Sequence, residues 1–64
     1  MSDIDTMNHY FVGSTGDRLR IMNLPGLAQG LEKDKALNLA AYLVSMSGAT
    51  REEFEAVLDA IENT

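Results

Sequence analysis

The chain has 64 residues, no cysteine, one histidine and a net charge of −5, with ten acidic residues against five basic ones. A chain this short buries only about 60% of its unfolded surface, so it usually needs a disulfide, a metal or oligomerisation. Without cysteines and with a single histidine, oligomerisation is the stabilising device that the composition leaves. The acidic total argues against general nucleic-acid binding.

Localisation is predicted from what the sequence lacks. No apolar run reaches the roughly 18 residues of a membrane span, and no basic-then-apolar signal peptide opens the chain. The absence of cysteine suits a reducing compartment. We therefore expect a cytoplasmic protein that has no membrane partner.

The chain is predicted to be one small domain with a short tail. Residues 1–7 are polar apart from Ile4 and are expected to be a disordered N-terminus. Residues 8–64 contain no internal repeat and are expected to form a single domain.

The first part of this domain predicts a β-hairpin. The segments NHYFVG and RLRIMNL flank the connection STGD, which is the pattern of two strands joined by a short turn. An even connection places Val12 opposite Leu19. It also places Tyr10 opposite Ile21, so that one face of the hairpin is apolar. A three-residue turn would mix these residues with the arginines, so the even connection is preferred.

The other face of the hairpin is a candidate ligand site. Arg18 and Arg20 point the same way about 7 Å apart, a spacing suited to a phosphate or carboxylate. His9 and Phe11 on the neighbouring strand provide stacking surfaces, and Tyr42 from the next helix is a further stacking candidate. The alternative is a solvated face whose arginines pair with acids of another subunit, and this is the more common arrangement.

Residues 33–47 predict a central helix. Pro25 and Gly26 form the turn that precedes it, and Gly48 ends it as a left-handed cap. Its apolar arc spans roughly 220°, about twice what a helix on one core needs, so we expect a second subunit to cover part of it. The flank predicted to contact the other subunit is Leu39, Leu43 and Met46. The flank predicted to face the hairpin is Leu37, Ala40 and Val44.

The last segment predicts a second, acidic helix. Thr50 and Glu53 form a capping box, and apolar residues recur at helical spacing from Phe54 to Ile61. The opposite face is predicted to bind a partner and consists of Glu52, Glu55, Asp59 and Glu62. The fold class is therefore α+β, a β-hairpin followed by two helices (ββαα), completed by homo-oligomerisation.

No group of residues indicates catalysis. His9 is the single base that titrates near neutral pH, and the neighbouring hydroxyls of Ser14 and Thr15 lie in the expected turn. The GSTG segment lacks the lysine of a phosphate-binding loop and precedes a strand. We predict a non-enzymatic protein with no catalytic residue, no metal site and no cofactor.

Two segments form a recognisable pattern: NLPG at residues 23–26 and LEKDKALNLAAYLV at residues 31–44. With a hairpin around the first and an acidic helix after the second, the chain resembles a loose group of small phage-encoded accessory proteins. It has Glu32 where a capping serine is usual and Tyr42 where tryptophan is frequent. The resemblance implies a protein made in the infected bacterial cell that antagonises a host defence or a host enzyme.

Two functions are expected on these grounds. The first is a non-catalytic, phage-type inhibitor that binds a host protein, one related to defence, through the acidic helix or an exposed apolar strip. The alternative is an oligomeric sponge that sequesters a small anionic nucleotide signal at a subunit interface, where Arg18 and Arg20 would hold it.

Overall fold

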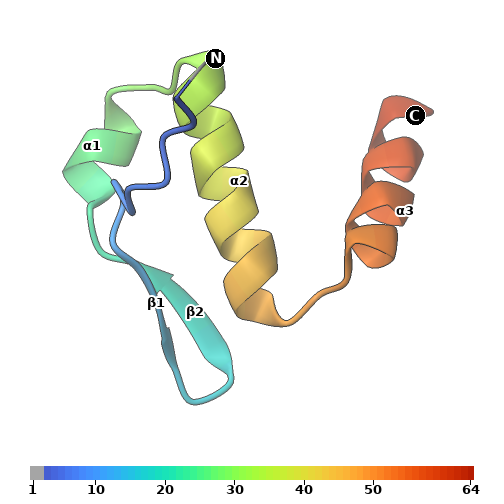
Figure 1. Cartoon of the computed structure of the whole chain (residues 1–64), viewed down its shortest axis with the longest axis horizontal. Coiled ribbons are helices and arrows are strands. Elements are labelled where there is room, and N and C mark those ends of the chain that lie inside the picture. Colours follow the sequence, from blue (N-terminus) through green and yellow to red (C-terminus); the bar gives the residue numbers. More distant parts are fainter. Residues whose placement is uncertain (1–2) are drawn as a thin grey trace.

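The computed structural model describes residues 3–64. Its elements in chain order are β1 (Val12–Thr15), β2 (Arg18–Ile21), α1 (Leu24–Ala28), α2 (Lys33–Ser47) and α3 (Arg51–Glu62). The hairpin lies beside α2, α1 connects the two, and α3 stands apart from them (Figure 1). The predicted α+β order is confirmed, but the described residues form three helices where the sequence predicted two.

The hairpin turns later in the sequence than predicted. Its two-residue turn begins at Gly16, whose φ of 66° lies in the left-handed region that tight hairpin turns require. Val12 pairs with Ile21 and not with Leu19, so the predicted register is wrong by two residues. Because the shift is even, the apolar side chains still share one face, and the arginines lie on the other.

The segment before β1 is held in a tight bend and does not continue the strand. The Asn8 side chain brackets the backbone of Val12: its Nδ2 donates to the carbonyl of Val12, and its Oδ1 accepts from the amide, both at 2.9 Å. Phe11 has a φ of 49°. The Tyr10 carbonyl accepts hydrogen bonds from the amides of Met22 and Asn23, so Tyr10 does not pair with Ile21 as predicted.

The predicted turn at Pro25 and Gly26 is instead the short helix α1. Asn23 caps it, since its Oδ1 accepts from the amide of Gly26 at 3.1 Å. Proline is compatible with a first helical turn because no hydrogen bond is required of its nitrogen there. A Cβ added at Gly26 would lie 2.6 Å from Nδ2 of Asn23, so a larger residue here would displace the capping side chain.

The core is small and lies between the hairpin and α2. The buried apolar residues are Tyr10, Val12 and Leu39. The partly buried residues packed around them are Ile21, Leu27, Tyr42 and Leu43. Leu39 therefore faces the hairpin, whereas Leu37 is 63% exposed, which reverses the predicted flanks of α2 for these two leucines.

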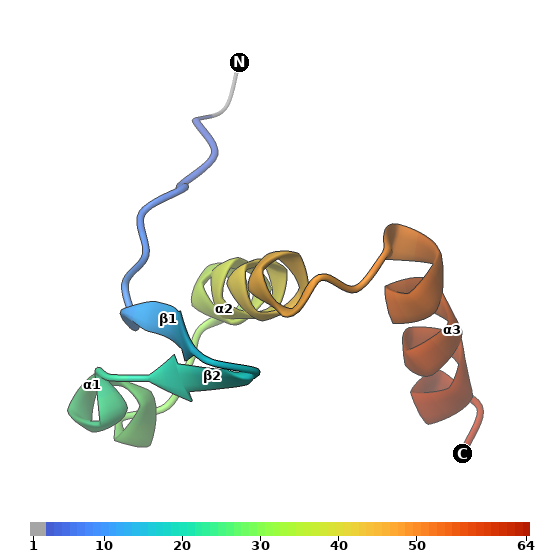
Figure 2. The same cartoon turned by 90° about the horizontal axis from the view of Figure 1, so that it is seen from below.

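The last helix is well capped but has no substantial packing contact with another element among residues 3–64. Its capping box is formed as predicted: Thr50 Oγ1 accepts from the amide of Glu53, and the Glu53 carboxylate accepts from the amide of Thr50. Gly48, at φ 80°, ends α2 before it. In both views α3 stands apart from α2 and the hairpin (Figures 1 and 2).

Candidate functional site

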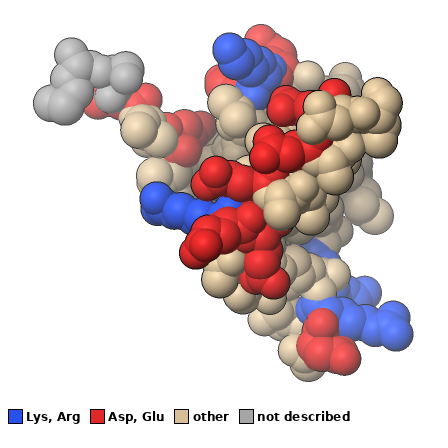
Figure 3. All heavy atoms as spheres, turned by 90° about the vertical axis from the view of Figure 1, so that its right-hand side faces the viewer, with Lys and Arg blue, Asp and Glu red and all other residues tan. Residues whose placement is uncertain are grey.

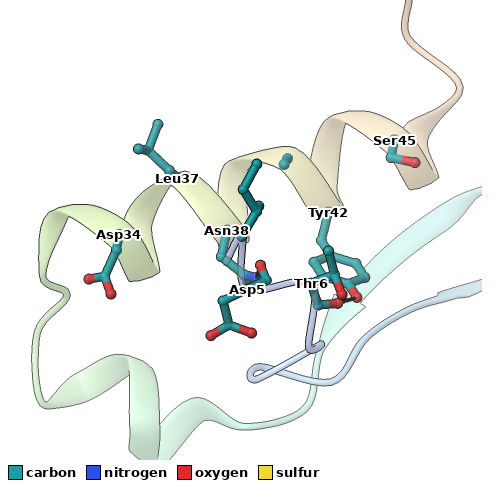
Figure 4. Close-up of a pocket in the computed structure, with 9 residues that line it drawn as sticks. Asp5, Thr6, Asp34, Leu37, Asn38, Tyr42 and Ser45 are labelled. Atoms are coloured by element: carbon teal, nitrogen blue, oxygen red, sulfur yellow. Dashed lines mark hydrogen bonds between the residues drawn. The ribbon is translucent and has the colours of Figure 1, made fainter. Parts of the chain in front are cut away.

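A segment that we call the strap, residues 3–7, lies along one side of α2. Nδ2 of Asn38 donates to the carbonyls of Asp5, at 3.0 Å, and Met7, at 3.1 Å. The Tyr42 hydroxyl donates to the Thr6 carbonyl, and Figure 4 shows both side chains directed at the strap. The predicted disordered N-terminus thus has three residues at hydrogen-bonded positions, while residues 1 and 2 lie outside the described part of the chain.

Asp5 joins the strap to two other elements. One of its carboxylate oxygens accepts from the amide of Met7 at 3.0 Å. The other lies 2.5 Å from Nε2 of His9 and 3.6 Å from Nζ of Lys35 at the start of α2. The hydrogen bond from Met7, then that from His9, and the positive charges of His9 and Lys35 lower the pKa of the Asp5 carboxyl below its ordinary value of 3.8.

Acidification is expected to loosen the strap. Because the pKa of Asp5 is lower in the folded chain than in the unfolded one, its contribution is fully present above pH 3.8 and is lost as the pH falls through the lowered value. The measurement is the chemical shift of the Asn38 side-chain amide, followed by NMR from pH 6 downwards. Asp5→Asn should weaken the strap already at pH 6 and remove this transition, and an unchanged transition would assign it to another carboxyl.

A groove of about 560 Å³ runs between the strap and α2. Its walls are mostly apolar, and α2 contributes Leu37 and Ala41 while the strap contributes Ile4. Asp34 and Ser45 lie toward its two ends on α2. The groove is open to solvent.

Neither Asn38 nor Asp5 is among the site residues predicted from the sequence. The available signal was the narrow polar strip along the central helix, which interrupts an otherwise apolar surface. A polar strip of this kind fits solvent as well as a covering segment, and only the fold shows that a side chain of the strip binds the strap, namely Asn38. The amide nitrogen of Asn38 donates to the strap, whereas its Oδ1 is buried and has no hydrogen-bond partner among the described residues.

The five residues predicted to bind an anion do not line a common cavity. Arg18 and Arg20 share one face of β2 and line a shallow groove of about 350 Å³ with Thr15 and Leu19. The other three lie elsewhere. His9 contacts Asp5, the Tyr42 hydroxyl is bonded to the strap, and Phe11 is exposed before β1.

The predicted oligomer interface also changes. Leu39 is buried in the core and Leu43 is packed against it, so both are already used within one chain. Met46 is 40% exposed and remains available. The sequence could not show which flank of α2 faces the hairpin, because both flanks are apolar. In the structure the hairpin packs on the side of α2 that carries Leu39 and Tyr42.

The predicted partner-binding face of α3 is exposed throughout. Glu52, Glu55, Asp59 and Glu62 are all exposed. Acidic side chains gather on the side of the molecule where α3 lies (Figure 3). From Arg51 to the last residue the chain holds five carboxylates and one base, a net charge of −4 out of −5. Most of the net negative charge of the protein is therefore on the segment that contains α3.

Within residues 3–64, no cluster of three or more histidine, aspartate and glutamate side chains is placed to hold a metal ion. None of the helices in this part of the chain has the length and apolar character needed to cross a membrane. Comparison of the chain with protein-family models, with curated proteins and with solved structures finds no match.

Proposed function

We propose that this chain is a non-catalytic binding protein of the phage accessory type, which inhibits a host protein, one related to defence, by occupying its surface. The observation that carries the proposal is α3, a capped helix that stands apart from the hairpin, α1 and α2, which together with the strap we call the body (Figure 1). Helix α3 exposes both an acidic and an apolar face. An exposed amphipathic helix is a common means of binding another protein.

The chemistry of α3 specifies the partner surface. Its acidic face is complementary to a basic patch, and a net charge of −4 within fourteen residues would speed encounter with such a patch. Inhibition by covering a partner's surface requires no reactive group. The groups in the body that come nearest to one are His9, Ser14 and Thr15. His9 is engaged with Asp5, and the hydroxyl residues Ser14 and Thr15 lie in β1.

Charge reversal tests the acidic face directly. Tagged wild-type protein is used to capture proteins from a bacterial lysate, and each captured protein is purified for a binding titration. The double variant Glu55→Lys, Asp59→Lys is expected to weaken binding at least tenfold, because a basic partner surface would then be repelled. The matched control, Asp17→Lys with Glu32→Lys, makes the same charge change on the body.

Comparison of the α3 variant with the control variant shows whether the acidic face contacts the partner. Loss of binding in the α3 variant with retention in the control supports the acidic face. Equal loss in both would reduce the effect to net charge, and equal retention would exclude the acidic face as the contact. A lysate that yields no specific partner would contradict inhibition of a host protein in that species.

A second candidate, a sponge for a small anionic nucleotide, rests on Arg18 and Arg20. They are exposed on one strand face, and neither forms an ion pair with a described residue. A thermal-shift panel of mono-, di- and cyclic nucleotides on wild type and Arg20→Ala separates the two functions. A ligand at 100 times its Kd would stabilise the fold by about 2.7 kcal/mol, which is several degrees for so small a domain. A flat panel would exclude the sponge.

A further inference from the structure

One chain exposes two apolar surfaces that it does not cover itself. The first is the stripe on α3, whose exposed residues are Phe54, Val57, Leu58 and Ile61. The second is the groove between α2 and the strap, where Leu37 is 63% exposed beside Ala41 and Ile4. A projecting apolar ridge and an open apolar groove on the same chain are complementary in shape and chemistry.

The connection between α2 and α3 holds these two surfaces apart. Gly48 adopts the left-handed conformation that ends α2, and the capping box at Thr50 fixes the start of α3. Ala49 is the single residue between these two caps. With both ends defined in this way, α3 stands apart from α2 (Figures 1 and 2), and none of its residues lines the groove.

Helix α3 needs a surface to pack on. It has twelve residues, and isolated helices shorter than about 12–15 residues are marginal in water. The capping box adds on the order of 1 kcal/mol, which does not replace a packed face. The formed helix therefore indicates that its apolar stripe is covered in the working state of the protein.

Charge selects which surface covers it. The segment from Arg51 onward has a net charge of −4, so two α3 helices packed on each other would place like charges together. The rest of the chain carries a net charge of −1 and holds four of the five bases. The groove itself is lined by Asp5, which pairs with His9 and Lys35, and by Asp34. The body of a second copy is thus the electrostatically preferred site for α3.

Area selects the stoichiometry. An apolar stripe on a twelve-residue helix is about 18 Å long. One such stripe in one groove buries less than the roughly 1,000 Å² that a specific interface needs. Two reciprocal contacts double the buried area, and a two-fold symmetric pair provides both together.

We infer that two copies exchange their last helices, with α3 of each lying in the groove between α2 and the strap of the other. The exchange covers both apolar surfaces at once and completes a core that holds three buried residues in one chain. It leaves the acidic faces outward, so it neither requires nor prevents the proposed binding to a host protein.

The first test is the mass in solution. Sedimentation equilibrium at micromolar concentration is expected to give twice the 7.0 kDa of one chain. Leu58→Glu on the stripe and Leu37→Glu in the groove should each return the mass to that of one chain, because each buries a charge in the contact. Glu55→Gln, on the outer face of α3, is the matched control and should remain dimeric.

The second test distinguishes exchange between chains from closure within a chain, and it exploits the absence of cysteine. Ala41→Cys and Val57→Cys are made as separate proteins, mixed and mildly oxidised. The exchange predicts a covalent heterodimer, and a control mixture of Ala41→Cys with Asp17→Cys, at the hairpin turn, should not form one. The double variant, with both cysteines in one chain, should form covalent dimers.

Each contrary result overturns the inference. A wild-type chain that remains a stable folded monomer at micromolar concentration excludes the exchange. A double variant that forms an internal disulfide at the mass of one chain, without crosslinking in the mixed samples, shows that α3 closes on its own α2. Dimers that persist in both glutamate variants place the interface elsewhere.

Discussion

Leu39→Ala is expected to remove most of the stability of the hairpin–helix body. Leu39 is 8% exposed and is one of three buried apolar residues. Leucine-to-alanine changes in a core cost about 2–5 kcal/mol. Because a chain of 64 residues is stabilised by only about 3–10 kcal/mol in total, the urea midpoint should fall by about half.

The measurement follows the tyrosines by near-UV circular dichroism. Both tyrosines of the chain lie in the body and there is no tryptophan, so this signal reports on the core and not on α3. Leu24→Ala, the same change at a residue that is 60% exposed in α1, is the control and should shift the midpoint little. Equal shifts in the two variants would mean that Leu39 is not in the core.

Asn23→Ala is expected to destabilise the same body by about 2 kcal/mol, through the loss of a helix cap and of a second hydrogen bond. The Oδ1 atom of Asn23 caps α1, and its Nδ2 donates to the carbonyl of His9 at 3.0 Å. The side chain therefore connects the bend before β1 with the helix after β2. Removing this side chain should loosen the segment before β1 and the segment after β2.

Asn23→Asp separates the two contributions, because aspartate keeps the capping oxygen and loses the amide donor. It should recover about half of the stability that alanine loses. Asn63→Ala is the matched control: its Nδ2 also donates to a carbonyl, that of Asp59, but at the exposed end of α3. If Asn63→Ala changed the tyrosine signal as strongly as Asn23→Ala, the effect would not belong to the hairpin.

A chain with so small a core is expected to depend on its contacts with other copies or with a partner. The body buries three apolar residues, while four large apolar residues of α3 remain exposed. A variant can therefore fail in two distinguishable ways. Changes in the body lower stability at every protein concentration, whereas changes on the stripe or in the groove alter stability in a concentration-dependent way.

The sequence by itself determined the features that rest on neighbours within a few residues. The capping box of Thr50 and Glu53, the left-handed cap at Gly48 and the bounds of the central helix are all present as predicted. Such features involve bonds between residues three or four apart, so the sequence carries both partners within one short window. The even number of residues in the hairpin turn is a local feature of the same kind and is also present as predicted.

Only the tertiary structure decided which surfaces meet. The flank of α2 that packs on the hairpin was ambiguous, because Leu37 and Leu39 are chemically equivalent and the apolar arc exceeded what one core needs. The place of the strap was equally undetermined, since Asn38 and Tyr42 bind backbone carbonyls, which every residue has. Both depend on contacts between residues far apart in the sequence, 27 positions for Leu39 and Val12 and 33 for Asn38 and Asp5, and no local pattern specifies such a contact.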